Sequence, residues 1–269
     1  MKIQVHINKK TVSINDRAFN YGDGLFETIL VKNNKPKLLN QHIKRLFVGC
    51  KRLSIKLPGI KRIKDSIKKA IGSTNECIIK IIYTRGISEH GYGCDSDITP
   101  QLYVIKKKKK LHVSKKFISL GYSQHVLSVN SYLSRIKHMN RLEQVLGYIN
   151  KDDDNTYDNH IMTNGNREII ECINSNIFFY KYTDILVVYT PILNNTGVDG
   201  ILKQEIIKTF QKKKVKVKNK NIKKADIKLY DGCFICNSIN GVQFVNKISN
   251  KTLNHIEYLE ELLDKYIYE

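Results

Sequence analysis

The chain has 269 residues, 41% of them hydrophobic, which is enough for one large domain or two modest ones with a real core. Lysine and arginine number 46 against 25 acidic residues, so the formal net charge is +21. No run approaches the roughly 18 apolar residues of a membrane helix, and the beginning, MKIQVHINKK, turns polar too early for a secretory signal. We therefore expect a soluble, cytoplasmic protein without a membrane partner.

The positive charge has two interpretations. Nucleic-acid binding is the first, but no nucleic-acid motif accompanies the lysines, which are spread along the chain apart from dense stretches at 106–110 and 212–224. Codon bias is the second, because abundant Lys, Asn and Ile without tryptophan suit an AT-rich genome and a solvated charged surface. We favour the second and expect no nucleic-acid partner. A basic nucleic-acid-binding protein remains the remote alternative.

The first 110 residues predict a small N-terminal α+β domain. In chain order the expected elements are two short strands around a turn (1–14), a loop (15–24), a hairpin turning at 33–36 (25–39), a helix capped by asparagine (40–55), a second amphipathic helix (60–71), and strands at 77–86 and 100–110.

A larger C-terminal domain is predicted for 121–269, after a connector at 111–120. The expected elements are a strand (117–122), the loop of Lys137 and a helix after it, short strands across 160–191, a glycine-bearing turn with a helix (194–213), a strand pair (231–245) and a final helix (253–267). In the helix after Lys137, the spacing of Leu142, Val145, Leu146 and Ile149 predicts one apolar face against the core.

The six cysteines do not form a disulfide framework at this length. Cys233 and Cys236, in CFIC, have the spacing of a metal or redox pair, but no second pair matches it and the residues between them are apolar. A buried strand with reduced thiols is the favoured interpretation, and no metal site is expected.

Several residue types suited to binding an anion occur along the chain. Gly197 and Gly200 bracket a helix start, where exposed N–H groups can bind a phosphate. Asn237 and Ser238 could add donors, and Arg45 has the fork geometry that suits phosphate. Each also has a plain structural interpretation: a loop-to-helix turn, a polar hairpin turn and a solvated helix arginine.

Lys137 and Glu171 are the two other residues with candidate chemistry. Lys137 lies in a loop before a helix, and Glu171 stands among isoleucines in a predicted buried strand. A buried carboxylate needs a cationic or protonated partner, and a protonated pyridine nitrogen would serve; a strand-edge glutamate facing water is the alternative. With an arginine and phosphate donors, these residues make the set that pyridoxal phosphate needs.

The order of the motifs resembles a known family. DRAFNYGDGLFET, HIKRL, KIIYTRG followed by GYG, IKHMNRLEQVL, IIECINSNIF, TGVDGI and FICNS occur here as in the class IV, or fold-type IV, pyridoxal-phosphate enzymes. The resemblance runs from Asp16 to about Val245. It implies an α+β, two-domain fold like that of D-amino acid aminotransferase, pyridoxal 5'-phosphate as cofactor and a homodimer.

Within that family the chain is most similar to the aminodeoxychorismate lyases. KHMNRLEQVL fits them, and Thr28 stands where branched-chain aminotransferases have glycine. The resemblance implies elimination of pyruvate from 4-amino-4-deoxychorismate to give 4-aminobenzoate for folate biosynthesis. A class IV aminotransferase acting on D-amino or branched-chain acids is the alternative.

The resemblance also implies roles for particular residues. Lys137 would carry the cofactor and move protons, and Glu171 would pair with the pyridine nitrogen. The phosphate would be bound by Arg45, the backbone N–H groups of Val198 and Asp199, and Asn237 and Ser238. Thr28 would line the catalytic pocket near the lysine, and Tyr21, Arg85 and Tyr92 are weaker substrate candidates. One departure is His90, which stands where some lyases have arginine.

Overall fold

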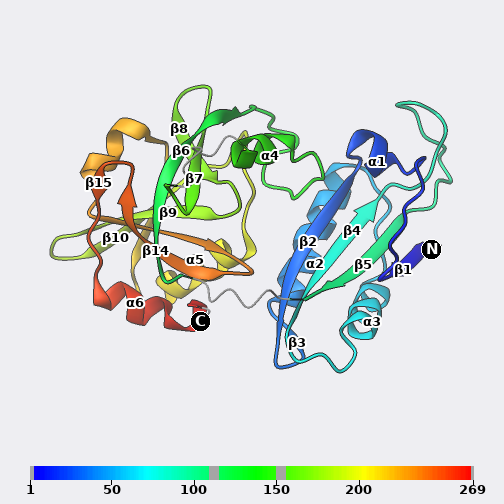
Figure 1. Cartoon of the computed structure of the whole chain (residues 1–269), viewed down its shortest axis with the longest axis horizontal. Coiled ribbons are helices and arrows are strands. Elements are labelled where there is room, and N and C mark those ends of the chain that lie inside the picture. The colour runs from blue at the N-terminus through cyan, green and yellow to red at the C-terminus, as the bar shows by residue number, and fades with distance from the viewer. Residues whose placement is uncertain (1–2, 109–114, 150–155, 268–269) are drawn as a thin grey trace. The chain divides into compact units, whose positions relative to one another are not determined.

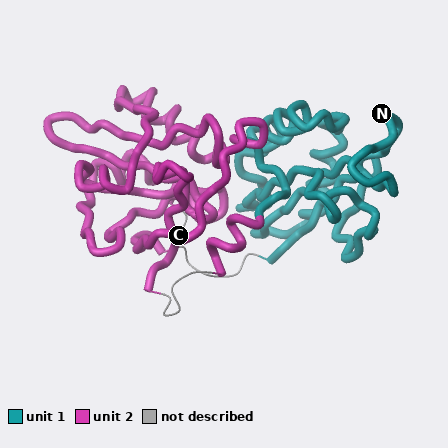
Figure 2. The backbone as a smooth tube through the Cα atoms, turned by 90° about the horizontal axis from the view of Figure 1, so that it is seen from above, with its two compact units in different colours: residues 1–111, 136–141 teal, residues 112–135, 142–269 magenta. Residues whose placement is uncertain are grey.

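The computed structural model describes residues 3–108, 115–149 and 156–267. The chain forms two compact units (Figure 2): an N-terminal unit, Met1–Leu111 with Ile136–Arg141, and a C-terminal unit, His112–Arg135 with Leu142–Glu269. The domain limits from the sequence stay a prediction. Part of the predicted connector, 111–114, lies outside the described residues.

The N-terminal unit is built on a five-stranded sheet with the order β1-β5-β4-β2-β3 (Figure 1). Its strands are β1 (Gln4–Ile7), β2 (Gly24–Lys32), β3 (Lys35–Pro36), β4 (Cys77–Thr84) and β5 (Gln101–Lys107). The pairs are antiparallel except for β1 with β5. The predicted hairpin and the strands of β4 and β5 are confirmed, whereas only one strand forms within 3–14.

Three helices belong to this unit: α1 (Arg17–Tyr21), α2 (Leu39–Arg52) and α3 (Ile60–Ile71). The prediction of α3 is confirmed. The asparagine cap predicted for α2 is wrong, because the helix begins one residue earlier, after Leu38 with φ of 52°. The predicted loop at 15–24 instead contains α1, since the Asp16 side chain accepts a hydrogen bond from the Ala18 N–H and caps a short helix.

The C-terminal unit contains a ten-stranded sheet with the order β11-β10-β9-β13-β14-β6-β7-β8-β12, and β15 pairs with β14. Its strands are β6 (Phe117–Leu127), β7 (Asn159–Asn164), β8 (Glu168–Cys172), β9 (Asn176–Tyr182), β10 (Leu186–Pro191), β11 (Lys216–Lys220), β12 (Ile222–Lys223), β13 (Gly232–Asn237), β14 (Gly241–Ile248) and β15 (Lys251–Thr252). The short strands predicted across 160–191 and the pair at 231–245 are confirmed.

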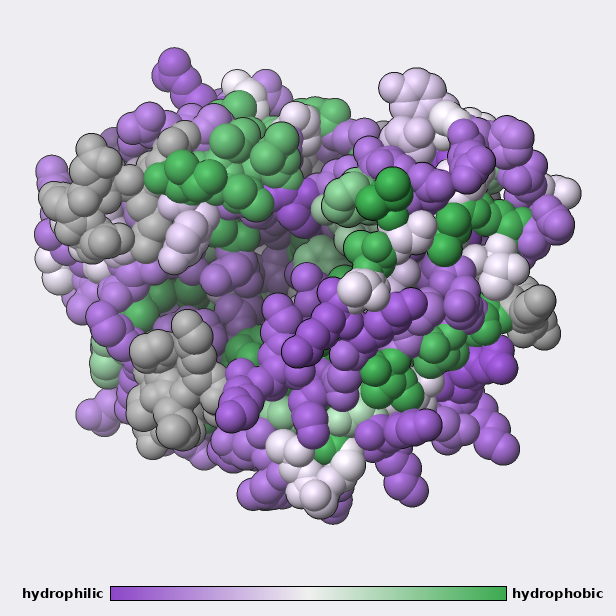
Figure 3. All heavy atoms as spheres, turned by 45° about the vertical axis from the view of Figure 1, so that its right-hand side comes forward, coloured by the Kyte–Doolittle hydropathy of each residue, from purple (hydrophilic) through white to green (hydrophobic). Residues whose placement is uncertain are grey.

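The helices of this unit are α4 (Leu142–Ile149), α5 (Ile201–Lys212) and α6 (Glu257–Leu263), with 3-10 turns η1 (Lys224–Leu229) and η2 (Asp264–Tyr266). In the described part of the chain, no helix is both long and apolar enough to cross a bilayer. The predicted helices at α5 and α6 are confirmed. Hydrophilic side chains cover most of the face seen in Figure 3, where hydrophobic ones form separate groups.

The apolar face predicted for α4 does not pack against the core. Leu142 is 68% exposed and Ile149 66%. The inward face is instead centred on Gly147, the one buried residue of the helix. A Cβ there would lie 3.1 Å from the Met162 Cε, so the absence of a side chain lets the helix approach β7 closely.

Cys233 and Cys236 both lie buried on β13, as predicted for a core strand. Side chains alternate along a strand, so residues three apart point to opposite faces of the sheet. Burial raises the pKa of the Cys236 thiol to about 12. The pair is therefore part of the packing and not a shared metal or redox centre.

Candidate functional site

Lys137 is positioned by strand pairing rather than by a helix. The Phe26 N–H donates to the Lys137 carbonyl and the Met139 N–H donates to the Gly24 carbonyl, each at 3.0 Å. The segment therefore extends along β2, and α4 begins five residues after the lysine. Lys137 Nζ lies 4.4 Å from the centroid of the Phe26 ring.

A second lysine lies against the same ring. Thr28 follows Phe26 on the same face of β2, because side chains alternate along a strand, and its register partner on β4 is Lys80. Lys80 Nζ lies 5.4 Å from the centroid of the Phe26 ring, so the two amines are at most about 10 Å apart, within the range of one small ligand. Burial, with the charge of Lys107, lowers the pKa of Lys80. Sequence reasoning missed Lys80, because only the strand register brings it near Lys137.

His138 supplies an unsatisfied polar atom beside the lysine. Its Nδ1 is buried and has no hydrogen-bond partner among the described residues. Burial, aided by Arg141 and Lys137, lowers the pKa of His138 to about 3, so the ring is neutral at neutral pH. Because consecutive side chains of an extended segment point to opposite sides, the His138 ring is directed away from the Lys137 amine.

Arg45 lies on α2 and is paired with Glu27. Its Nε and one Nη donate to the two Glu27 carboxylate oxygens at 2.8 and 2.6 Å, and His42 Nδ1 contacts the same carboxylate at 2.6 Å. Glu27 and His42 are each 1% exposed. Although burial opposes ionisation, Arg45 and His42 lower the pKa of Glu27 to about 2. Phosphate binding by Arg45 remains a prediction. The Glu27 carboxylate orients one edge of the Arg45 guanidinium.

This buried ion pair predicts a pH-dependent stability. The pKa of Glu27 is depressed from 4.5 to about 2, so its stabilisation is complete above pH 4.5 and is lost as the pH falls towards 2. Glu27→Gln should lower the free energy of unfolding at pH 7 by about 3 kcal/mol. Denaturant unfolding should show that the difference in free energy of unfolding between the wild type and Glu27→Gln becomes smaller between pH 4.5 and 2.

The control for Glu27→Gln is Glu261→Gln, which changes an exposed carboxylate on α6. Its effect on unfolding should stay small at every pH. If the difference in free energy of unfolding between the wild type and Glu27→Gln stayed constant from pH 7 to pH 2, the assignment of an ionised, buried pair would be contradicted.

Arg85 is held by the protein itself. Its guanidinium donates to both Asp23 carboxylate oxygens and to the carbonyls of Leu53 and Ser54, at 2.7 to 3.0 Å. Four of the five N–H groups of an arginine are thus engaged. Arg85 therefore braces the turn after β4, and substrate binding by it remains only a prediction.

The rings of Tyr21 and Tyr92 lie together, and Tyr92 belongs to a loop that is held by hydrogen bonds from Arg17. Their ring centroids are 5.5 Å apart, and Tyr92 is 91% exposed. The buried Arg17 guanidinium donates to the carbonyls of all four residues 90–93, which holds the loop in place. His90, the departure from the lyase pattern, is exposed and lies 3.4 Å from an Asp95 oxygen.

In the C-terminal unit, Glu171 is buried on β8 at 5% exposure, which favours the interpretation of a core strand over a solvent-facing edge. Its Oε2 accepts a hydrogen bond of 2.9 Å from the Val198 N–H. Gly197, just before, has φ of +82°, and a Cβ there would lie 2.8 Å from the Ile170 side chain. The close approach of this turn to β8 therefore requires glycine.

The predicted phosphate donors already have partners within this unit. Besides the Val198 N–H, the Asp199 N–H donates to the Arg135 carbonyl at 3.1 Å. Asn237 Nδ2 donates to Ser175 Oγ, while its Oδ1 accepts the N–H groups of residues 239 and 240, a polar hairpin turn. Phosphate binding by these groups and by Ser238 stays a prediction, and it would require some of these bonds to be exchanged.

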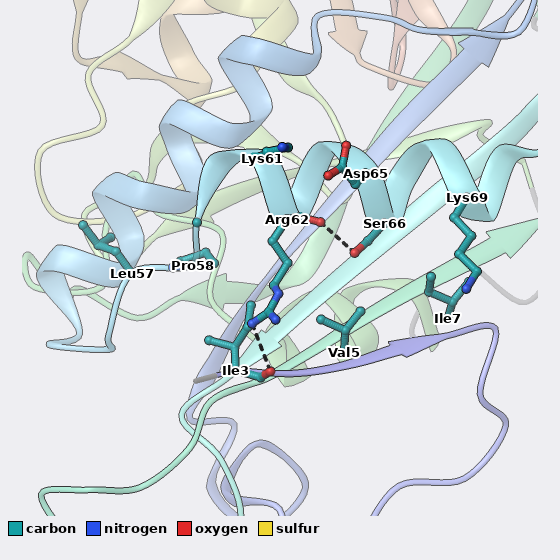
Figure 4. Close-up of a pocket in the computed structure, with 11 residues that line it drawn as sticks. Ile3, Val5, Ile7, Leu57, Pro58, Lys61, Arg62, Asp65, Ser66 and Lys69 are labelled. Carbon is teal, nitrogen blue, oxygen red and sulfur yellow. Dashed lines mark hydrogen bonds between the residues drawn. The ribbon is translucent and has the colours of Figure 1, made fainter. Parts of the chain in front are cut away.

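A groove of about 810 Å³ lies elsewhere in the N-terminal unit (Figure 4). Aliphatic side chains of β1 point towards α3, which contributes charged ones. None of the candidate residues lines it. Across the described residues, no three His, Cys, Asp or Glu side chains gather in a way that could hold a metal ion.

Comparison with known proteins places these residues in a family. Residues 24–248 match the class IV amino-transferase family, so the chain belongs to that family. The resemblance seen in the motifs and the predicted fold are thereby confirmed, and the chain is an enzyme of this class.

The individual relatives include lyases and aminotransferases. An aminodeoxychorismate lyase of Vibrio harveyi is 27% identical over 241 residues, which cover 88% of each chain. A D-alanine aminotransferase of Listeria innocua is 25% identical over 237 residues, covering 86% of this chain and 80% of the relative. The crystal structure of 4-amino-4-deoxychorismate lyase from Pseudomonas aeruginosa matches with a TM-score of 0.87 and 26% identity, over 96% of this chain and 94% of that one.

Proposed function

We propose that the protein is an aminodeoxychorismate lyase, which eliminates pyruvate from 4-amino-4-deoxychorismate and leaves 4-aminobenzoate for folate biosynthesis. One observation carries the proposal: the lyases of Vibrio harveyi and Pseudomonas aeruginosa match nearly the whole chain, with 27% and 26% identity. The sheet face with Thr28, Lys80 and Lys137 supports it, because it combines an amine with a second cation for an acidic substrate.

The cofactor in this proposal is pyridoxal 5'-phosphate. When bound, it supplies an electron sink for the carbon that bears the substrate amine. Lys137 would hold the cofactor, and its amine would take the proton from that carbon. Glu171 would pair with the ring nitrogen and favour its protonated form. Arg45 would bind the phosphate.

Lys80 provides a cation for the substrate, which carries two carboxylates. It shares the Phe26 ring with Lys137, and it makes no hydrogen bond or ion pair with any residue in the described ranges. Arg85 is less suited because its donors are already engaged. We therefore assign Lys80 to a substrate carboxylate.

Lys80→Met should raise KM for aminodeoxychorismate about tenfold and change kcat little, because a carboxylate contact made equally in the ground and transition states affects binding alone. Initial rates of 4-aminobenzoate formation measure both constants. Lys64→Met, at an exposed position on α3, is the matched control and should leave KM unchanged. An unchanged KM in Lys80→Met would remove this residue from the substrate site.

A class IV aminotransferase is the second candidate, because of the similarity to the Listeria innocua enzyme. The purified protein can be mixed with D-alanine and 2-oxoglutarate, and in parallel with aminodeoxychorismate alone. The proposal predicts rapid 4-aminobenzoate formation in the second mixture and little glutamate in the first. Rapid glutamate formation without 4-aminobenzoate would favour the aminotransferase.

The proposal includes a cytoplasmic homodimer that does not bind nucleic acid. Exposed apolar residues on α4 and before it support association, because monomers rarely leave such groups uncovered: Val126, Val129, Tyr132, Leu142, Val145, Tyr148 and Ile149. Light scattering of the purified protein measures its mass directly.

A further inference from the structure

Strand β1 forms an open edge of the sheet in the N-terminal unit. It is the outermost strand, and among the described residues it pairs only with β5, in parallel. The Gln4 and Asn8 N–H groups donate to the carbonyls of Pro100 and Val104. Because alternate residues of a parallel strand bond to the same neighbour, the N–H and C=O groups of Val5 point away from β5. They are available to an added strand.

The groove beside this edge has an apolar floor. Ile3, Val5 and Ile7, on and just before β1, point towards α3 and line the groove (Figure 4). Val5 and Ile7 are only half-buried, so the packing of α3 leaves part of their aliphatic surface uncovered. The volume of about 810 Å³ is typical of a ligand-binding cleft. Every second side chain of a strand added to β1 would enter this groove, because side chains alternate along a strand.

Two cations of α3 lie above opposite ends of this floor. Arg62 reaches towards Ile3, whose carbonyl accepts a hydrogen bond of 3.4 Å from Arg62 Nη1. Lys69 points towards the Ile7 end of the strand, whereas Asp65 points away from β1 (Figure 4). Arg62 and Lys69 are seven residues apart, about 10 Å along the helix. Neither makes an ion pair with any residue in the described ranges.

The charge of α3 favours an acidic partner. The helix carries five basic residues and one acidic residue: Lys61, Arg62, Lys64, Lys68 and Lys69 against Asp65. A second copy of the chain is disfavoured, because pairing β1 with β1 about a two-fold axis would bring two basic helices together on one face of the joined sheet. An acidic segment is attracted to the helix at long range and can pair with the two cations above the groove.

We propose that the groove between β1 and α3 binds an extended, acidic segment of a partner protein, which adds a strand to the free edge of β1. On the face towards α3, this segment carries one apolar side chain with an acidic one two residues to either side. The apolar side chain packs on Val5, and the acidic ones pair with Arg62 and Lys69. Two strand residues four apart are separated by about 13 Å, which the long side chains of Arg62 and Lys69 can span. Binding there requires none of the residues assigned to the proposed reaction.

The test measures the fluorescence anisotropy of a labelled nine-residue peptide of threonines, with a central valine and a glutamate two residues to either side of it. Two double variants of α3 with the same net charge are compared with the wild type: Arg62→Glu with Lys69→Glu, and Lys64→Glu with Lys68→Glu. The first should bind the peptide about tenfold more weakly or worse. The second changes exposed residues outside the groove and should lose less than about threefold. Melting temperatures show whether both variants fold.

A second measurement tests strand pairing with the wild-type protein alone, so it does not depend on the folding of a variant. Alternate N–H groups of the peptide are replaced by N-methyl groups, in one set or in the other. Methylation of one set should abolish binding, because it blocks the hydrogen bonds to the edge of β1. Methylation of the other set, which faces away from β1, should leave the affinity unchanged.

Four results would overturn the inference. The first is that the wild type does not bind the peptide, whether or not it binds vesicles of anionic lipid. Equal weakening in the two double variants would mean that net charge alone attracts the peptide. Equal effects of the two methylated peptides would mean that no strand is added to β1. An oligomer of the wild type that dissociates in the Arg62→Glu, Lys69→Glu variant would mean that a second copy of the chain occupies the groove.

Discussion

Replacing Lys137 with alanine should abolish 4-aminobenzoate formation, with a loss of about 10⁴-fold or more, because both the covalent attachment of the cofactor and the proton-transferring amine disappear. The substitution should also remove the near-visible absorbance of the lysine-bound cofactor. The fold should survive, since the hydrogen bond between the Phe26 N–H and the Lys137 carbonyl does not involve the lysine side chain. Stopped assays for the product and an absorbance spectrum measure the two effects.

Lys137→Arg separates the effect of the positive charge at this position from the effect of an amine that can act as a base. Arginine keeps the positive charge above the Phe26 ring but is always protonated and cannot serve as the base. It should therefore be as inactive as Lys137→Ala. Activity above one-tenth of the wild type in either variant would contradict the assignment of Lys137 as the reacting amine.

Replacing Glu171 with glutamine should lower kcat by about 10²-fold to 10³-fold, the range found when one group that stabilises developing charge is lost. Glutamine is nearly isosteric and can still accept the hydrogen bond of the Val198 N–H, so the turn before α5 should be retained. What is lost is the negative charge that keeps the ring nitrogen protonated. Steady-state rates with saturating cofactor measure the effect.

The matched control is Glu168→Gln on the same strand. Glu168 is half-buried and accepts a hydrogen bond from Asn164, so its change tests the general tolerance of β8 to losing a carboxylate. We expect it to leave kcat within a few-fold. Equal losses in the two variants would show that the effect is on the fold, and no loss in Glu171→Gln would remove Glu171 from the site.

Regular elements with a strong local pattern were predictable from the sequence. The helix α3 has the predicted bounds, because its apolar residues repeat at helical spacing. The buried residues of this helix lie on its apolar face. The hairpin of β2 and β3 was likewise marked by its turn residues. These features depend on neighbours a few residues apart.

The features that sequence reasoning missed depend on distant contacts. The apolar spacing on α4 indicated the wrong inner face, since the close approach of Gly147 to β7 determines the helix orientation. The start of α2 was misplaced because Leu38 adopts a left-handed conformation that no propensity rule suggests. Lys137 lies before its helix, as expected, but the sequence did not show that its loop runs extended and pairs with β2.

The candidate site shows the same division. Motifs suggested Lys137, Glu171 and Arg45, whose roles stay predictions, whereas Lys80 was missed. Lys80 becomes a candidate only through its register opposite Thr28 and its contact with the Phe26 ring. In a chain with so many lysines, composition cannot distinguish a functional lysine from a solvated one, but burial and missing partners can.

The central claim, elimination rather than amino transfer, is tested most directly by following pyruvate and 4-aminobenzoate together. The purified protein, loaded with pyridoxal 5'-phosphate, is mixed with aminodeoxychorismate and no keto acid. We predict that the two products appear at the same rate and in equal amounts. Failure to release pyruvate, or a requirement for an added keto acid, would contradict the account.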